Sequence, residues 1–205
     1  MWAWFADRPD CWVGEDHNIY YRHGDNGVVV APYVCVSFGV DPEPLISAAS
    51  YRVWEVGAPP AFVLEIASEK TFKADLHVKP SKYLDIGVQE YWRFDPSGGE
   101  FLQPALQGDH RVGDTWQPVT IGTDADGRLS GHNHALDLAL HAQAHRLRFR
   151  DPRTGTWLAD PDEQIQARRA AEARADRQTA RADQQIAATA AAEARAGIAH
   201  SHRPT

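Results

Sequence analysis

The composition of the chain changes abruptly at residue 162, and this limits how much of it can form a packed domain. Of the 37 residues from 162 to 198, 14 are Ala, none is Pro, and six Arg balance six Asp and Glu. Ala has the highest helix propensity, so the segment predicts a long C-terminal helix. Residues 199–205 are expected to fray. The globular domain is therefore expected within residues 1–161, a length typical of one domain.

Most of the first 161 residues alternate between short apolar segments and turn clusters. Residues 75–86 instead predict a helix that is closed by Gly87. Pro80 favours a start of this helix near Val78 or Lys79, because proline is tolerated only in the first helical turn. Segments rich in β-branched and aromatic residues predict strands at His17–Arg22, Val28–Phe38, Tyr51–Val56, Ala61–Ser68, Glu90–Phe94, Gln117–Ile121, Ala135–Leu140 and Arg146–Arg150. The pattern indicates a mixed α/β or α+β domain.

The sequence argues against a membrane-spanning chain and against a disulfide-rich one. No apolar run approaches the length of about 18 residues that a transmembrane helix needs. The N-terminus lacks the basic region and long apolar core of a signal peptide. The two cysteines, Cys11 and Cys35, are expected to be free buried thiols in a reducing cytoplasm. We therefore expect a cytoplasmic protein without membrane contact.

The apolar segment from Phe62 to Ala67 carries a charge, Glu65, in its middle. Burying a lone carboxylate is costly unless it is paired or binds a cation. A buried strand here would therefore favour a metal-dependent site. The alternative is an edge strand whose Glu65 faces water.

Asp75, Lys79 and Tyr83 are spaced by four residues, which places them on one face of a helix. Opposite Glu65, such a face would suit metal-assisted phosphodiester hydrolysis. Glu65 would hold the cation, and Lys79 would orient the attacking water and offset the charge of the phosphate. The alternative is a surface pair of Asp75 and Lys79 that contributes about 0.3 kcal/mol, with Tyr83 in the core.

A longer pattern joins these residues to the segment that follows them. It consists of Phe62–Ser68, Asp75, Lys79, Tyr83, Gly87, Val88, Glu90, Tyr91, Trp92, Asp95 and Pro96. The pattern resembles the Uma2 family, restriction-endonuclease-like proteins of the PD-(D/E)XK nuclease superfamily, and the resemblance covers nearly the whole chain. It implies a mixed β-sheet flanked by helices, a Mg²⁺ site built from two acidic residues, and DNA as the substrate.

The resemblance also implies which residues form the site. Glu65 matches one metal-binding acid, and Lys79 matches the family's helix lysine, since Ala67 stands where the superfamily lysine would follow the glutamate. The other acid is expected at position 33, where this chain has Tyr33. A phenol cannot replace a carboxylate on Mg²⁺, so binding of Mg²⁺ is expected to be weak or lost. Family members also carry an N-terminal helix before the element that starts here at Asp7, and this helix is expected to be truncated.

The charge distribution suits DNA only locally. The net charge of −7 makes the whole chain a poor non-specific DNA binder. All four lysines, however, lie between residues 70 and 82, where Asp75 is the single acid. This basic rim, with Arg52 and Arg93 as further candidates, fits a nuclease and equally fits a solvated helix.

Four histidines near the end of the domain resemble a cluster of metal ligands: His132, His134, His141 and His145. His132 and His134 would share one face of a strand. Without a Cys or a carboxylate at ligand spacing, exposed side chains are the expected state.

We therefore predict a Mg²⁺-dependent endonuclease that hydrolyses DNA, with Glu65 and Lys79 as site residues and with activity impaired by Tyr33. The alternative is a non-catalytic protein of nuclease fold that binds DNA or self-assembles, for example as a homodimer through the Ala-rich helix.

Overall fold

The computed structural model describes residues 4–160 and part of the segment that follows: 163, 166, 169–172, 174, 177, 178 and 181. The chain divides into two units, Met1–Leu158 and Ala159–Thr205. In the second unit the described residues from 163 to 181 are helical. The rest of the helix predicted over 162–198, and the end predicted to fray at 199–205, lie outside the described residues.

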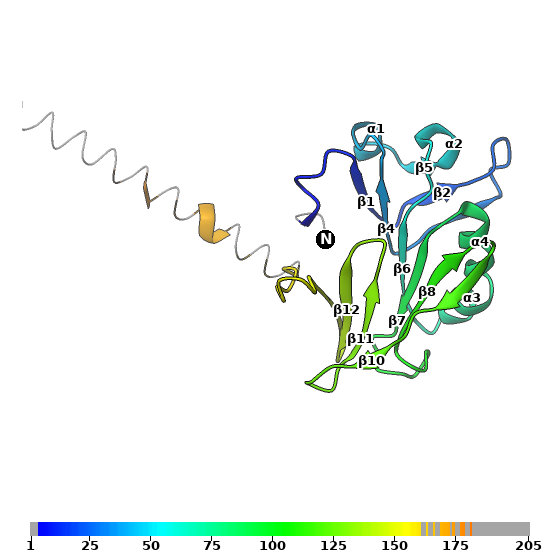
Figure 1. Ribbon diagram of the computed structural model, residues 1–205. Helices are drawn as coiled ribbons and strands as arrows, with labels where there is room; N and C mark the ends of the chain where they lie inside the picture. Colours follow the sequence, from blue (N-terminus) through cyan, green and yellow to red (C-terminus); the bar gives the residue numbers. More distant parts are fainter. Residues whose placement is uncertain are drawn as a thin grey trace, which may run out of the picture. The chain divides into compact units, whose positions relative to one another are not determined.

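A six-stranded mixed sheet forms the centre of the first unit (Figure 1). Its strands, in spatial order, are β1 (Cys11–Glu15), β4 (Val34–Phe38), β6 (Phe62–Ile66), β7 (Glu90–Phe94), β8 (Leu106–Val112) and β9 (Thr115–Pro118). Only β6 and β7 pair in parallel, and the other neighbours are antiparallel. A parallel pair needs a crossover, which is supplied by the helices α3 (Phe72–His77) and α4 (Lys79–Ile86).

Two smaller sheets and two short helices complete the unit. The sheet of four strands consists of β10 (Gly122–Thr123), β11 (Leu129–Asn133), β12 (Leu138–Gln143) and β13 (Arg146–Arg150). The sheet of three strands contains β3 (Val29–Val30), β2 (Asn18–Tyr20) and β5 (Ser50–Arg52), and the short helices are α1 (Glu43–Ile46) and α2 (Val53–Val56). This architecture confirms the predicted mixed α+β class.

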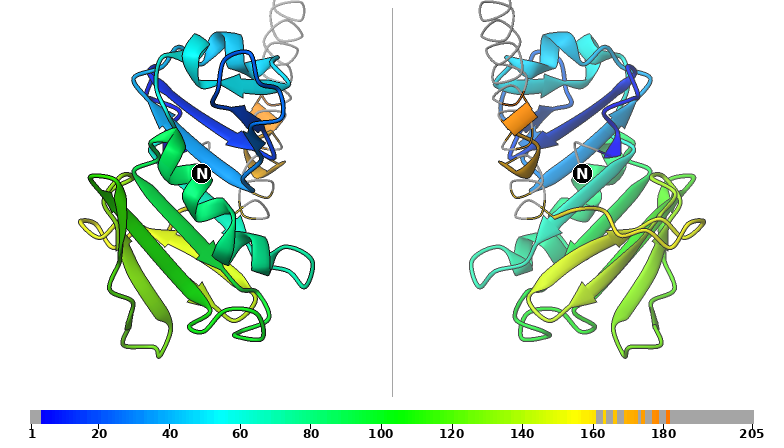
Figure 2. Two further views of the ribbon diagram at one scale, coloured as in Figure 1. Left: turned by 90° about the vertical axis from the view of Figure 1, so that its right-hand side faces the viewer. Right: turned by 90° about the vertical axis from the view of Figure 1, so that its left-hand side faces the viewer.

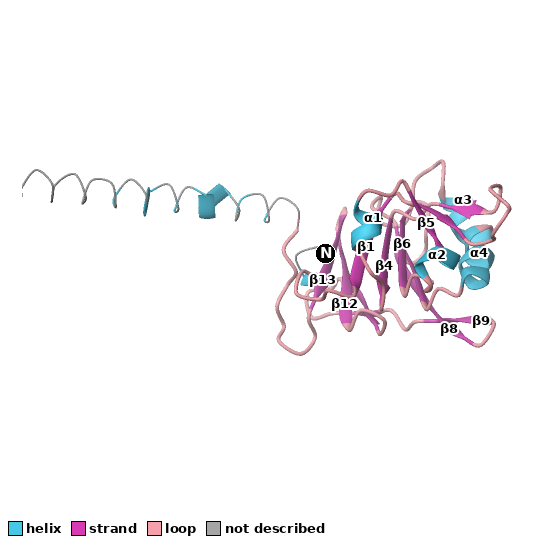
Figure 3. Cartoon of the chain, turned by 90° about the horizontal axis from the view of Figure 1, so that it is seen from above, coloured by secondary structure: helices cyan, strands magenta, loops and turns pink. Residues whose placement is uncertain are grey.

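The elements of the first unit stack in layers, with the central sheet between α3 and α4 on one face and β10–β13 on the other (Figures 2 and 3). Successive side chains of a strand point to opposite faces. Phe62 and Leu64 therefore enter one core with Trp92. Val63 enters the other core with Tyr83. Glu65, two residues after Val63, is consequently on the face that α3 and α4 cover.

The predicted helix is divided into α3 and α4 at Val78. Pro80 lies in the first turn of α4, where its missing N–H costs no helical hydrogen bond. Gly87 ends α4 in the left-handed region, with φ of 94°. The structure thus confirms the start near Lys79 and the end at Gly87.

Four strand predictions are wrong in part. The predicted strand Val28–Phe38 is interrupted at residues 31–33 and forms β3 and β4, and only Gln117 and Pro118 of the predicted strand Gln117–Ile121 lie in β9. Only Tyr51 and Arg52 of the predicted strand Tyr51–Val56 lie in β5, and Val53–Val56 form α2. Gly57, with φ of 84°, caps that helix, and this end signal competes with the strand preference of the apolar residues. The strand predicted at Ala135–Leu140 is β12, shifted toward the C-terminus because residues 134–137 form a turn. The sequence does not predict the strands β1, β8, β10 and β11.

Both cysteines are buried and free, as the sequence predicts. Burial raises the pKa of the Cys35 thiol to about 12, so it stays protonated and packs as a small apolar group. Among the described residues, no helix combines the length and the apolar character needed to cross a membrane.

Trp92 fills the space between the two larger sheets because two of its neighbours are glycines. A Cβ added to Gly108 on β8 would lie 2.7 Å from Trp92 Cε2. A Cβ added to Gly131 on β11 would lie 2.8 Å from Trp92 Cη2 and 2.6 Å from Cδ1 of Ile121. The close approach of the two sheets therefore requires glycine at both positions.

We expect Gly108→Ala and Gly131→Ala each to lower the free energy of unfolding by about 1–3 kcal/mol, the usual cost of overpacking a core. Urea denaturation followed by Trp fluorescence measures this change. Gly122→Ala is the matched control, since a Cβ there meets nothing within 4 Å. Equal stability of all three variants would contradict this packing.

Candidate active site

Glu65 is buried beneath the helices. Its residue is 4% exposed, and it lies on β6, an inner strand of the central sheet. The alternative of an edge strand with a solvated glutamate is therefore wrong. The carboxylate oxygen Oε1 lies 2.7 Å from the Lys79 ammonium and accepts a hydrogen bond from the Tyr83 hydroxyl.

The Lys79 ammonium joins Glu65 to a second carboxylate. Its Nζ lies 2.9 Å from Asp75 Oδ1 as well as 2.7 Å from Glu65 Oε1. Asp75 and Lys79 belong to different helices, but Val78 between them keeps a right-handed helical conformation. The spacing of four residues therefore still brings both side chains to one face. We call Glu65, Asp75 and Lys79 the charge triad.

Two buried tyrosines fix the surroundings of the charge triad. Tyr83 donates to Glu65, and the Tyr91 hydroxyl donates to the main-chain oxygen of Asp75 at 2.8 Å. Their ring centroids are 4.9 Å apart. The role of Tyr91 was not predicted, although its alternation with Trp92 along β7 places it on the same face as Val63, its partner in the register.

The burial of the charge triad determines its protonation. Desolvation raises the pKa of Glu65, and the Lys79 ammonium partly offsets this rise. Desolvation alone would lower the pKa of Lys79, but the two carboxylates outweigh it and raise that pKa. Burial likewise raises the pKa of the Tyr83 phenol. At neutral pH, Lys79 is therefore a charged donor and Tyr83 a neutral one, and neither is a base.

The charge triad holds more carboxyl groups than ammonium groups. Glu65 and Asp75 supply two carboxyl groups, and Lys79 supplies one ammonium. The next buried cation, Arg93, is paired with Asp109. Asp75 is 0% exposed, and apart from the Lys79 ammonium its carboxylate oxygens have no hydrogen-bond donor in the part of the chain that is described. A buried anion of this kind favours the uptake of a further cation.

The two carboxylates of the triad would leave most coordination positions of a bound metal ion for water or substrate. Mg²⁺ commonly binds one or two carboxylates and completes its shell with water and substrate phosphate. Glu65 and Asp75 are the residues that could hold it here. Within the described ranges, no three or more His, Cys, Asp or Glu are grouped to hold a metal by themselves.

Tyr33 lies in a bend immediately before β4, outside the central sheet. In the antiparallel register, Val34 is opposite Leu64 and Cys35 is opposite Val63. Continued by one residue, this register brings Tyr33 opposite Glu65. The Tyr33 residue is 50% exposed. Immediately before β4 the chain therefore carries a half-exposed phenol and no carboxylate.

Among the described residues, the other three lysines of the segment form no ion pair with Glu65 or Asp75. Lys70 and Lys73 are exposed. Lys82 donates to the main-chain oxygen of Val29 at 3.2 Å. The prediction that Arg93 adds to this rim is wrong, because Arg93 is buried against Asp109.

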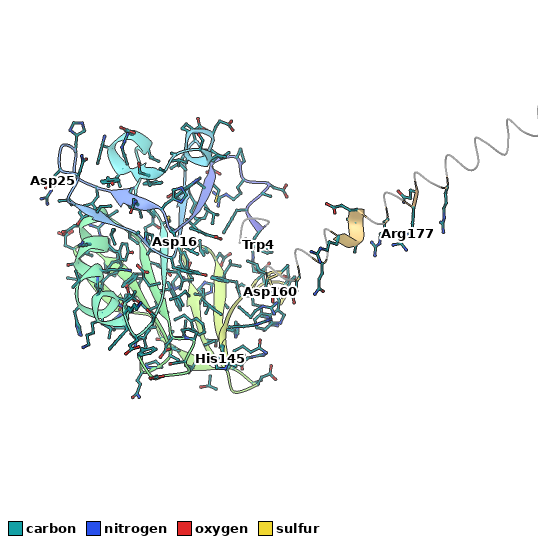
Figure 4. The ribbon with its side chains drawn as sticks, turned by 180° about the vertical axis from the view of Figure 1, so that it is seen from behind. Trp4, Asp16, Asp25, His145, Asp160 and Arg177 are labelled. Carbon is teal, nitrogen blue, oxygen red and sulfur yellow. The ribbon has the colours of Figure 1, made fainter. Side chains whose placement is uncertain are left out.

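The four histidines do not form one ligand cluster. The rings of His132 and His134 touch, with centroids 4.6 Å apart. His145 lies in the turn between β12 and β13 (Figure 4), and its Nδ1 is 2.7 Å from the Pro96 oxygen. The expectation of exposure is wrong for His141, which is 5% exposed because Trp157 packs against its ring.

The buried His141 predicts a loss of stability in mild acid. Burial lowers its pKa below the ordinary value, Asp124 opposes this shift, and Arg128 and Arg150 add to it. Below the ordinary histidine pKa of about 6.5, the unfolded chain therefore binds more protons than the folded one.

We expect the free energy of unfolding to fall between pH 7 and pH 5, and to fall less in His141→Gln. Urea denaturation at each pH measures both slopes, and His145→Gln is the control on an exposed histidine. Identical slopes for the native chain and His141→Gln would contradict the assignment.

Comparison with known proteins gives a match to a protein family. The model of the Uma2 family, described as a putative restriction endonuclease, matches residues 1–143. No curated protein matches the sequence.

Proposed function

The chain belongs to the Uma2 family, and on that premise we propose that it is an endonuclease that hydrolyses DNA phosphodiester bonds with Mg²⁺. The observation that supports this most is the charge triad: a buried strand carboxylate, Glu65, held 2.7 Å from the ammonium of a helix lysine, Lys79. A bound Mg²⁺ would polarise the phosphate and lower the pKa of the attacking water.

The proposed roles follow from the protonation of these residues. Glu65 is the proposed metal ligand, because Lys79 and Tyr83 both contact Oε1 and the second oxygen of the carboxylate offers further lone pairs. Lys79 is the proposed donor that orients water and stabilises charge on the phosphate, since its raised pKa keeps it an ammonium. The exposed Lys70 and Lys73 would contact the DNA backbone, so binding should weaken as salt rises.

We propose that the activity is weak, because position 33 carries a phenol instead of a carboxylate. Mg²⁺ prefers hard anionic oxygens, and Tyr33 offers none at neutral pH. A cytoplasmic location, where thiols such as Cys11 and Cys35 stay reduced, is part of the same proposal.

Nicking of supercoiled plasmid DNA in Mg²⁺ or Mn²⁺ tests the function. We expect slow cleavage by the native chain and faster cleavage by Tyr33→Asp. Glu65→Gln should lower the rate by about 10²-fold or more, the scale for losing one charged group at a reacting centre. Glu69→Gln is the control, since Glu69 is exposed and four residues from Glu65. If plasmid stays intact with both the native chain and Tyr33→Asp, the proposal is wrong.

The second candidate is a non-catalytic protein of nuclease fold that binds DNA or self-assembles. The half-exposed Tyr33 in place of an acid favours it. It predicts a gel shift with DNA that Glu65→Gln leaves unchanged, and no cleavage by the native chain. Sizing chromatography of the full chain over a range of concentrations would detect a homodimer.

A further inference from the structure

The Asp75 carboxylate is a buried charged group with few partners to compensate for its removal from water. It is fully buried, and apart from the Lys79 ammonium its oxygens have no hydrogen-bond donor among the described residues. Its one ion-pair partner among the described residues is the Lys79 ammonium, 2.9 Å from Oδ1. Burying a charge without compensating hydrogen bonds costs several kcal/mol in general, so such a group is retained only with a strong partner.

Lys79, the ion-pair partner of Asp75, also contacts Glu65. The same ammonium lies 2.7 Å from Glu65, so one ammonium faces two carboxyl groups. Neither tyrosine removes the imbalance, because Tyr83 and Tyr91 are neutral and Tyr91 donates to the main-chain oxygen of Asp75, not to its carboxylate. Two carboxylates therefore flank one position that now holds a single positive charge.

We propose that Glu65 and Asp75 bind one divalent cation of the Mg²⁺ or Mn²⁺ class, in competition with the Lys79 ammonium. Asp75 thereby supplies the second carboxylate that position 33 lacks. This inference rests on the proposed role of Glu65 as a metal ligand and adds a residue from α3. When the cation binds, the Lys79 side chain, which is 18% exposed, is released from the carboxylates toward solvent and substrate.

Competition distinguishes this proposal from a purely structural ion pair. In a structural pair, removing Lys79 leaves two buried anions and only destabilises the fold. In a cation site, removing Lys79 also removes the competitor, so a divalent ion binds more tightly and restores stability.

Thermal unfolding of the full-length chain in a titration of Mn²⁺, with EDTA as reference, tests the proposal. We expect Mn²⁺ to raise the Tm of the native chain. Asp75→Asn and Glu65→Gln should each lose this rise, and Glu69→Gln, the exposed control, should keep it. In Lys79→Met the half-saturating Mn²⁺ concentration should fall by about tenfold or more, because one competing charge has been removed.

Three results would overturn the inference: no rise in Tm of the native chain, an unchanged rise in Asp75→Asn, or a Lys79→Met that binds Mn²⁺ no more tightly than the native chain. If Asp75→Asn does not fold, Lys79→Met decides alone. If Lys79→Met is unfolded in EDTA, folding on addition of Mn²⁺ supports the inference and a failure to fold contradicts it.

The outcomes also separate this inference from the proposed function. Binding of Mn²⁺ that depends on Glu65 but not on Asp75 would overturn the inference and leave the proposed nuclease intact. Binding that depends on neither residue would contradict both.

Discussion

The Lys79 ammonium lies between two carboxylates that the fold has largely removed from water, and this contact joins three elements of the domain. Glu65 comes from the central sheet and Asp75 from α3, while Lys79 begins α4. One side chain thus ties both crossover helices to the sheet. Because desolvated ion pairs gain little net stability, the contact is better explained by chemistry than by folding energy.

The rest of the domain holds this contact in place from both faces of the sheet. On the helix face, Tyr83 and Tyr91 fill the space around the triad and donate hydrogen bonds at its border. On the opposite face, Trp92 and the two glycines beside it let the four-stranded sheet cover β6 and β7 closely. The carboxylates of the triad are thus largely buried, and burial strengthens the electrostatic interactions between them and Lys79.

The sequence predicted local structure correctly where a residue type is tolerated in only one kind of position. Pro80 and Gly87 predicted the limits of α4, and the charge within Phe62–Ala67 predicted that a buried Glu65 would need a partner, which is Lys79. It was insufficient where a choice depends on distant residues. The apolar segment Val53–Val56 fits a strand or a helix, and the left-handed Gly57 decides for the helix. The burial of Asp75 depends on β7, which follows it in the chain, so the spacing with Lys79 predicted their contact but not the missing hydrogen bonds.

The central claim is that the charge triad is a cation site with a lysine in competition. Crystals soaked in Mn²⁺ and measured for anomalous scattering test it most directly. We expect one peak within bonding distance of Glu65 and Asp75 carboxylate oxygens, with the Lys79 ammonium displaced from at least one of them. A map without a peak there, with Lys79 still bridging both carboxylates at saturating Mn²⁺, would contradict it.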